Sequence, residues 1–541
     1  MSVRGGVGAG AAGLWLFGVL LVPDALEDVT PGLWARIPGE AVVGAAVLLM
    51  LPRRARGWAA GVFGAVLGAL AVVNLLDIGF GEYLGRGFNP VLDWGLLDDA
   101  RSYLRDTTGP GTTWLATAGA VLLPVALVVG TALAAVRLSR LLGCHPAVAN
   151  RSTLLAATAW ITCAGLGVQL GGAPVAADRA RETLESKART VRWTLRDEAA
   201  FAREAQTDPF GATPGGELLP ALRGKDVVFA FIESYGRTAV EDPAIAPGVT
   251  ATLDRRERAL EASGYRARSG WLTSATFGGS SWLGHSTFLS GLWVDNQARY
   301  RTVTAGDRLT LTGAFRKTGA WDTVGVMPGV QKAWPEQRFF GLNTVYNAFG
   351  LGYEGPKFGW STMPDQYALE AFERLEHGRE RDRPLMSEII LTSSHQPWAP
   401  VPEMVDWDDL GDGSRFESIE RAGHRSSEIA ADAGRSKEEY GRSISYSVTS
   451  LTEWLERYGT DDTVLVFLGD HQPLAKVTGP QPSRDVPVSI VAKDPKVLER
   501  VEGWRWTEGL RPGEGAPVWR MSAFRDRFLT AYGSTPRPGG S

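Results

Sequence analysis

The first third of the chain alternates long apolar stretches with short polar loops. Four uncharged stretches, at 5–23, 57–76, 107–136 and 152–177, are each long enough to cross a bilayer, which requires about 20 residues. A fifth apolar run, 41–52, is too short alone and must borrow residues 33–38. The pattern predicts a transmembrane domain of five helices over residues 1–177.

Charges in the loops orient these helices, because Arg and Lys accumulate on the cytoplasmic side. The loops at 52–57 and 137–151 each carry three arginines and no acidic residue, whereas the loop at 77–106 carries six acidic residues and three arginines. With Arg4 inside as well, we expect a cytoplasmic N-terminus, a multi-pass protein of the cell membrane, and an extracytoplasmic domain after about residue 177. A cleaved signal peptide is the alternative for the first stretch, but no A-x-A site follows it before Asp24.

A different pattern follows. Residues 178–223 begin with a mixed-charge helical stretch and predict a stalk or linker. From Asp226 onward, short apolar runs rich in β-branched residues are separated by helical stretches. Continuous runs of this kind are typical of strands buried on both faces. We therefore predict an α/β domain over 224–495 with a central, mostly parallel sheet, and a C-terminal extension over 496–541 with a flexible tail. The runs lie at 227–232, 322–327, 388–393, 463–469 and 486–492.

Composition narrows the functions that this domain can have. Residues 1–175 carry 21 charged side chains, against 95 in the remaining 366 residues, and the net charge of −4 argues against a nucleic-acid partner. Cys144 and Cys163 both lie in or beside the apolar third. The charged part therefore cannot contain a disulfide, a thiolate metal site or a cysteine nucleophile.

Residues of the kind that bind metals follow three of the five predicted strands. Glu233 follows the first run, His395 the third, and Asp470 and His471 the fourth. Ligands of α/β sheets bind beyond the carboxyl ends of the strands. A helix cap is the more ordinary role for any one such residue. The chain has only six histidines, however, and two of them stand at these ends, while His285 lies in the segment considered next.

A Gly/Ser-rich segment, 273–291, supplies candidate hydroxyl groups. Ser280 and Ser281 precede a helical stretch at 282–289. A hydroxyl there would meet the positive end of the helix dipole and free N–H groups, a favourable place for a phosphate. An ordinary serine N-cap is the alternative.

Together these segments resemble the alkaline-phosphatase superfamily, in its sulfatase-like branch of membrane enzymes, which contains lipoteichoic acid synthase, phosphoethanolamine transferases and phosphoglycerol transferases. FIES at 231–234 and FLGDHQP at 467–473 are similar to its metal-ligand segments, and TSSHQPW at 392–398 to its substrate-histidine segment. The resemblance implies an alkaline-phosphatase-like fold and a divalent ion, for which we expect Mn²⁺ before Zn²⁺ or Mg²⁺. The implied ligands are Glu233, Ser281, Asp470 and His471.

The resemblance also implies a nucleophile. Counted back from Gly291, the sulfatase signature places the nucleophile at Ser281, with Ser280 as the alternative. The Pro and Arg of the signature are Leu283 and His285 in this chain. Maturation to formylglycine is therefore not expected, and an unmodified serine favours phosphoester over sulfate-ester chemistry.

A further segment, 331–350, is similar to the substrate loop of lipoteichoic acid synthase around Trp334. The arginine expected two residues later is Glu336 here, with Arg338 as a substitute. The resemblance implies that His395, Trp334, Arg338 and His285 contact the substrate, and that His395 also serves in catalysis.

We therefore expect a phosphotransferase or phosphodiesterase that transfers or hydrolyses a phospho-alcohol head group through a serine phospho-enzyme. Its expected partners are a membrane lipid or lipid-linked donor and an envelope glycopolymer or lipid acceptor. A sulfuric ester hydrolase and a non-catalytic sulfatase-like sensor or scaffold are the alternatives. The acidic, helix-poor stretch 401–446 is expected to be a surface insertion.

Overall fold

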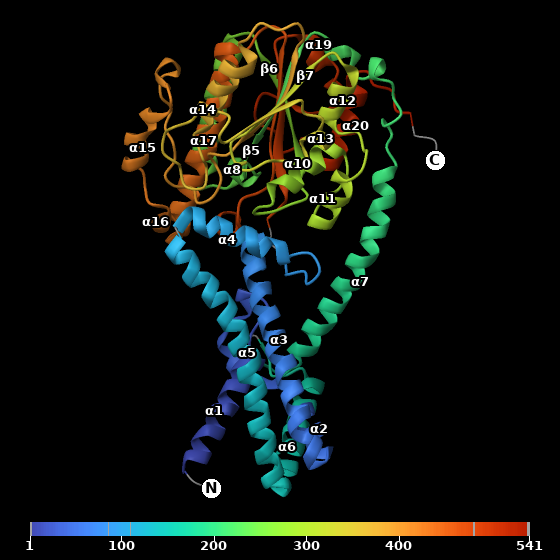
Figure 1. Ribbon diagram of the computed structural model, residues 1–541, viewed down its shortest axis with the longest axis vertical. Coiled ribbons are helices and arrows are strands. Elements are labelled where there is room, and N and C mark those ends of the chain that lie inside the picture. The colour runs from blue at the N-terminus through green and yellow to red at the C-terminus, as the bar shows by residue number, and fades with distance from the viewer. Residues whose placement is uncertain (1–2, 85, 109, 172, 480–481, 538–541) are drawn as a thin grey trace. The chain divides into compact units, whose positions relative to one another are not determined.

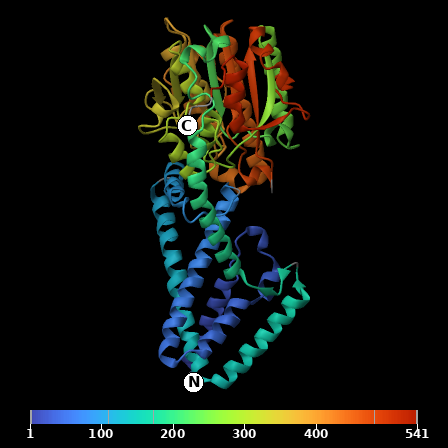
Figure 2. The same ribbon diagram turned by 90° about the vertical axis from the view of Figure 1, so that its right-hand side faces the viewer.

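The computed structural model describes residues 3–84, 86–108, 110–171, 173–479 and 482–537. The chain divides into two compact units, an N-terminal unit of Met1–Glu82 with Arg86–Arg196 and a C-terminal unit of Tyr83–Gly85 with Asp197–Ser541. The predicted stalk is not a unit of its own. It contains one continuous helix, α7 (Arg179–Gln206), in which the boundary between the two units falls (Figures 1 and 2).

The N-terminal unit is helical. Each of the five predicted apolar stretches contains a helix, and the loop at 77–106 contains a sixth, amphipathic helix that the sequence analysis missed. Two short ladders join β1 (Ile37–Pro38) to β4 (Ala176–Ala177) and β2 (Gln169–Leu170) to β3 (Ala173–Pro174). The helices are α1 (Val3–Leu20), α2 (Gly39–Met50), α3 (Arg53–Leu84), α4 (Trp94–Thr108), α5 (Pro110–Cys144) and α6 (Pro146–Leu166).

Two of these helices, α3 and α5, are long and apolar enough to cross a membrane by length and composition. Only 33% and 22% of their most apolar stretches are buried within the structure. The α2 helix has 12 residues, which span about 18 Å against a hydrocarbon core of about 30 Å. The prediction of five spans is therefore not confirmed.

Small residues bring α3 and α5 into close contact. Gly64 and Gly68 are spaced as in a G-x-x-x-G motif, and a Cβ at either position would lie 2.6–2.8 Å from atoms of α5. Small residues at this spacing let membrane helices approach until their backbones touch. This packing is typical of helices that associate within a bilayer.

The C-terminal unit is built around a mixed sheet in the order β12-β6-β11-β10-β5-β9-β7-β8, with β13 beside β6. The strands from β10 to β8 are parallel, but β11, β6 and β12 pair antiparallel, so the expected mostly parallel sheet is parallel only on one side. The predicted strands correspond to β5 (Asp226–Ile232), β7 (Asp322–Met327), β9 (Leu385–Leu391), β10 (Thr463–Gly469) and β11 (Asp485–Ala492). The others are β6 (Arg266–Thr273), β8 (Thr344–Asn347), β12 (Thr507–Glu508) and β13 (Val518–Arg520).

Helices cover both faces of this sheet. Helices α9 (Ala246–Ala262), α14 (Asp365–Phe372) and α17 (Ala433–Tyr458) enclose one apolar core, and α10 (Ser281–Ser290), α12 (Leu311–Thr318) and α20 (Phe524–Ala531) enclose the other. Figure 1 shows α14 and α17 on one side of the strands and α10, α12 and α20 on the other. The shorter helices are α8 (Thr238–Glu241), α11 (Gln297–Thr304), α13 (Gln337–Phe340), α15 (Glu417–Ala422), α16 (Ser426–Ala431), α18 (Ala475–Thr478) and α19 (Pro495–Glu499).

Two sequence expectations need correction here. The stretch 401–446 is not a surface insertion throughout, because its last 14 residues begin α17 and bury Tyr440 and Ile444 in the core. Residues 496–541 are more than an extension, since β12, β13 and α20 are part of the sheet and of its packing. The last four residues of the predicted flexible tail lie outside the described residues.

Candidate active site

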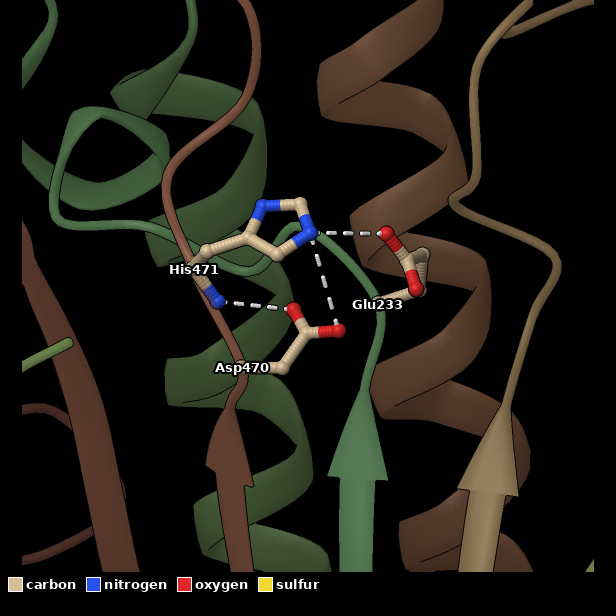
Figure 3. A group of neighbouring side chains, drawn as sticks. All are labelled: Glu233, Asp470 and His471. Carbon is tan, nitrogen blue, oxygen red and sulfur yellow. Dashed lines mark hydrogen bonds and ion pairs between the residues drawn. The ribbon is translucent and has the colours of Figure 1, made fainter. Parts of the chain in front are cut away.

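Three neighbouring parallel strands deliver the site to one edge of the sheet. Glu233 comes directly after β5, and Asp470 and His471 directly after β10, as Figure 3 shows. The loop after β9 carries His395. Glu233, Asp470 and His471 are buried, and one ligand atom from each lies within 4.8 Å of the others. The structure thus brings the predicted ligands together, because parallel strands end at a common edge.

The Asp470 carboxylate is held by the backbone around it. Its Oδ1 accepts hydrogen bonds from the N–H of Ser234 at 2.7 Å and of His471 at 2.8 Å. Gly469 makes this arrangement possible, since a Cβ there would lie 1.8 Å from the carbonyl oxygen of Tyr235. The other oxygen, Oδ2, is buried without a hydrogen-bond partner among the described residues. A buried carboxylate oxygen without a partner is costly unless a cation or donor meets it.

The imidazole of His471 is oriented by a backbone carbonyl. Its Nδ1–H donates to the carbonyl oxygen of Gln472 at 2.8 Å, so that Nε2 faces Oε1 of Glu233 at 3.2 Å. Burial opposes the charge on His471, but the carboxylates of Asp470 and Glu233 outweigh it and raise the pKa of His471 to about 9. Burial likewise opposes the charge on Glu233, yet His471 holds the pKa of Glu233 well below its usual range. The pair of carboxylates therefore strongly favours a positive charge at this point.

The hydroxyl of Ser281 lies in the middle of this cluster. Its Oγ donates a hydrogen bond to Oε2 of Glu233 at 2.8 Å and lies 3.1 Å from Nε2 of His471. Ser281 is the first residue of α10, so its hydroxyl is also at the positive end of a ten-residue helix. A serine in this environment has both a proton acceptor and a field that stabilises its anion.

Two backbone positions at the site are strained. Ser234 and Ser280 have φ of 56° and 62°, in the left-handed region that residues with a Cβ rarely occupy. Such strain concentrates at functional sites. Ser280 stands before α10, but its side chain makes no capping hydrogen bond to the helix. The ordinary N-cap considered as an alternative for this segment is therefore not found.

The four residues fit a divalent cation. Two carboxylates, a hydroxyl and an imidazole nitrogen converge, and the unpartnered Oδ2 of Asp470 lies 3.8 Å from Nε2 of His471. The raised pKa of His471 means that His471 holds a proton at the point where the carboxylates of Glu233 and Asp470 attract positive charge. Ligands of this mixture suit Mn²⁺, Zn²⁺ or Mg²⁺.

A cavity of about 220 Å³ opens beside Ser281. Of the residues expected to contact substrate, His395, Trp334 and His285 line it, and Ser280 lines it as well. Arg338 does not, because its exposed side chain lies on α13 away from the lining. The lining also includes Glu233, Ser281, Trp282, Ser286, Tyr300, Met327, Gly329, Val330, Phe340, Trp360, Glu388, Ile390 and Thr392.

His395 is positioned by its own loop and by Trp360. Its Nδ1–H donates to the carbonyl oxygen of Gln396 at 2.5 Å, and its ring stacks on Trp360 with centroids 3.9 Å apart. Burial lowers the pKa of His395. The ring is therefore held as the Nδ1–H tautomer, with Nε2 on the opposite side.

Asp365 holds the loop that carries His395. Its Oδ1 accepts from the N–H groups of Thr392 and Ser393 at 2.7 and 2.9 Å, and its Oδ2 from the hydroxyl of Ser447 at 2.6 Å. Asp365 is fully buried at the start of α14. These bonds fix the chain two and three residues before His395.

Sequence reasoning missed Glu388, Tyr300, Trp360 and Asp365. Glu388 had a visible signal, because a charged residue inside an apolar strand is unusual and requires a partner or a function. Tyr300, Trp360 and Asp365 come from α11, from a loop and from α14, and no local pattern distinguishes them. Only the folded chain brings them to the cavity or to its support.

Known proteins similar to this chain are found among solved structures. No protein-family profile and no curated protein matches the chain. Among solved structures, the chain is similar to the lipoteichoic acid synthase LtaP from Listeria monocytogenes, with 16% identity, 58% of this chain and 77% of that chain covered, and a TM-score of 0.37. It is also similar to the phosphoglycerol transferase GacH from Streptococcus pyogenes, solved with sn-glycerol-1-phosphate, with 12% identity, 63% and 80% covered, and a TM-score of 0.38.

A third similar structure is a protein in the alkaline phosphatase superfamily from Vibrio parahaemolyticus, with 18% identity, 55% and 69% covered, and a TM-score of 0.34. The roles of individual residues rest on the geometry of this chain.

Proposed function

We propose that this chain is a metal-dependent phosphotransferase or phosphodiesterase that uses Ser281 as its nucleophile. The observation that carries the proposal is the hydroxyl of Ser281, which lies 2.8 Å from Glu233 and 3.1 Å from His471, on a residue that lines a cavity. A hydroxyl with an acceptor in reach, placed where a substrate can enter, has the geometry of an activated nucleophile.

The proposed reaction has two halves. Oγ of Ser281 attacks the phosphorus of a phosphodiester, its proton passes to Oε2 of Glu233, and the bond from phosphorus to the leaving alkoxide breaks. An acceptor hydroxyl or water then attacks the phosphoserine, the bond from phosphorus to Oγ breaks, and Oγ of Ser281 takes its proton back from Oε2 of Glu233. A divalent ion held by Glu233, Ser281, Asp470 and His471, with Mn²⁺ proposed first, would lower the pKa of the serine hydroxyl and offset charge on the phosphoryl oxygens.

His395 is the proposed general acid and base. Because Nδ1–H is committed to the carbonyl of Gln396, protons enter and leave through Nε2. An anionic phosphodiester beside the ring raises its pKa and favours the imidazolium, which gives its proton to the leaving alkoxide. The neutral ring then takes a proton from the entering hydroxyl. Trp334 and His285 are the proposed substrate contacts from the sequence analysis that the cavity retains.

The proposed donor is a membrane lipid or a lipid-linked phospho-alcohol, and the proposed acceptor is an envelope glycopolymer or lipid. The support is the N-terminal unit, whose α3 and α5 expose their apolar surfaces and pack through Gly64 and Gly68. A membrane anchor raises the local concentration of lipid substrates. We further propose five membrane crossings, a cytoplasmic N-terminus and an extracytoplasmic active site, on the charge pattern of the loops.

Two alternative functions predict different results in one assay. A sulfuric ester hydrolase would act on sulfate monoesters, and a non-catalytic sensor or scaffold would bind without turnover. The test is an assay of the purified full-length protein on bis-p-nitrophenyl phosphate, p-nitrophenyl phosphate and p-nitrophenyl sulfate, with and without Mn²⁺. We expect Mn²⁺-dependent turnover of the diester above both monoesters. Preferred turnover of the sulfate would contradict the phosphoester assignment, and no turnover of any ester would favour the scaffold.

A further inference from the structure

One acidic residue of the cavity has no role in the proposed reaction. Glu388 lies in the middle of β9, between Phe229 of β5 and Gly325 of β7. Its side chain is 1% exposed and lines the same cavity as Ser281. Its Oε2 has no hydrogen-bond partner among the described residues. A buried carboxyl without a partner is destabilising, so its presence at this point needs a compensating function.

The alternation of side chains along β9 places Glu388 on the face of the sheet that carries the cavity. Side chains alternate along a strand, so Glu388 shares its face with Met386 and Ile390. Both of these contact the core that α10 and α12 enclose, and Ile390 also lines the cavity. Ser387 and Ile389 point to the opposite face, where Ile389 packs in the other core. The carboxyl group of Glu388 is therefore part of the cavity wall.

Aromatic rings form much of the remaining wall. Tyr300, Trp334, Phe340 and Trp360 line the cavity together with Glu388, and the described lining contains neither Arg nor Lys. Within the described part of the chain, no ion pair to Glu388 exists closer than the usual limit of 4.0 Å, and His285 is the titratable neighbour that opposes the rise in the pKa of Glu388. Aromatic faces attract cations, most strongly where water is excluded.

These observations separate three classes of head group. An anionic head group would meet the carboxylate of Glu388 with no Arg or Lys in the lining to balance it. A neutral polyol would leave the acidic group uncompensated and gain little from the aromatic walls. An ammonium group would meet a carboxylate and several aromatic rings at once, which is the combination that recognises alkylammonium ligands.

We propose that Glu388 binds a cation in this cavity and selects donors whose head group carries an ammonium group. The inference rests on the proposed function, because it names the head group of the phosphodiester that Ser281 attacks. It adds no covalent step, since the ammonium group is bound and released unchanged. Burial raises the pKa of Glu388 to about 7, against a smaller opposing effect of His285, and a bound cation would favour the ionised form.

The test compares two diesters that differ by a single ammonium group, p-nitrophenyl 2-aminoethyl phosphate and p-nitrophenyl ethyl phosphate, on the purified full-length protein with Mn²⁺. The measured quantity is the ratio of their kcat/KM values. We expect the native ratio to be about 10 or more in favour of the aminoethyl ester, and to approach 1 in Glu388→Gln, which keeps the size of the side chain but not its charge. Ser387→Ala, on the other face of the same strand, is the matched control and should keep the native ratio.

Either a native ratio near 1 or an unchanged ratio in Glu388→Gln would overturn the proposal. The native ratio needs no variant, so the test remains decisive if Glu388→Gln does not fold. Calorimetric binding of 2-aminoethyl phosphate and ethyl phosphate to native protein separates this inference from the proposed function. Preferential binding of the aminoethyl compound without turnover of either diester would support the cation site and contradict the catalytic proposal. Turnover of both diesters without a preference for either would support the catalytic proposal and contradict the cation site.

Discussion

The hydroxyl of Ser281 donates a hydrogen bond to Oε2 of Glu233 at 2.8 Å, across 48 positions of sequence. Glu233 directly follows a central strand and Ser281 begins a helix on one face of the sheet, so the contact joins two segments that approach each other only in the folded chain. The preceding hydroxyl, that of Ser280, lines the same cavity but belongs to a residue in the left-handed backbone region. This difference gives the nucleophile assignment its test.

Replacing Ser281 by Ala should lower turnover of bis-p-nitrophenyl phosphate by on the order of 10⁴ or more, because no hydroxyl remains to form the phospho-enzyme. Ser280→Ala should cost less than about tenfold. Mass spectrometry of peptides from residues 270–297, after trapping with a phosphodiester, should place the phosphate on Ser281. Phosphate on Ser280 or Thr276 would contradict the assignment.

Replacing Asp470 by Asn should remove metal binding together with activity, since one of two anionic ligands loses its charge. The amide oxygen can still accept the N–H bonds of Ser234 and His471, so we expect the fold to survive. Metal content after dialysis, measured by mass spectrometry, and activity after chelation and return of Mn²⁺, Zn²⁺ or Mg²⁺ check this. Asp461→Asn, at the exposed start of the β10 region, is the control and should retain both properties. Full activity of Asp470→Asn in chelator would refute a metal site here.

Replacing His395 by Ala should leave metal content unchanged and lower kcat by roughly 10² to 10⁴, the range expected for loss of a general acid and base. The ring of His395 is not among the convergent metal ligands, and its loop is held separately by Asp365. The same substitution should lower turnover of an ester with a better leaving group, such as a dinitrophenyl ester, by a smaller factor, because the dinitrophenolate leaves without taking up a proton. Loss of metal in His395→Ala would assign the residue to the metal site instead.

The acidic group of Glu388 should make stability depend on pH. Its folded pKa of about 7 lies above its ordinary value of 4.5, so the protein is most stable, as far as this group is concerned, below pH 4.5. That stability is lost as pH rises through 7, by about 3 kcal/mol in all. Glu388→Gln carries no such dependence. The Tm of this variant, relative to native protein, should therefore rise between pH 4.5 and pH 8, as measured by thermal unfolding in metal-free buffer. For Ser387→Ala, we expect the difference in Tm from native protein to stay constant over this pH range. A constant difference for Glu388→Gln would contradict the raised pKa of Glu388.

A topology reporter tests the orientation of the chain. An alkaline phosphatase fusion after residue 225 should be active, because we propose an extracytoplasmic C-terminal unit, and a fusion after Arg140 should be inactive. A cytoplasmic reporter at the same two points should show the opposite activities. Activity after Arg140 together with inactivity after 225 would reverse the proposed orientation and exclude a lipid-linked donor of the outer surface.

Local sequence determined the parts of this protein that depend on short-range pattern. The apolar runs located β5, β7, β10 and β11 to within one residue, because a buried strand needs a continuous apolar segment wherever it lies in the fold. The local sequence also placed Glu233, Asp470 and His471 at strand ends. Parallel pairing of neighbouring strands was then enough to bring these three residues together. The strand β6 was missed because its first three residues are exposed or half-buried and interrupt the apolar pattern.

The count from Gly291 favoured Ser281 and left Ser280 open, and the tertiary structure shows that Ser281 is the serine that meets Glu233 and His471. Neighbouring residues share one local pattern and differ only in the backbone that the fold imposes on them. The tertiary structure also decided that α17 begins inside the stretch expected as an insertion, since Tyr440 reaches the carbonyl oxygen of Ser234 only across the folded unit. For the same reason Arg338, close to Trp334 in sequence, lies outside the cavity, while Glu388 lies within it. A cavity is made of side chains from many elements, and its composition follows from packing that no single segment encodes.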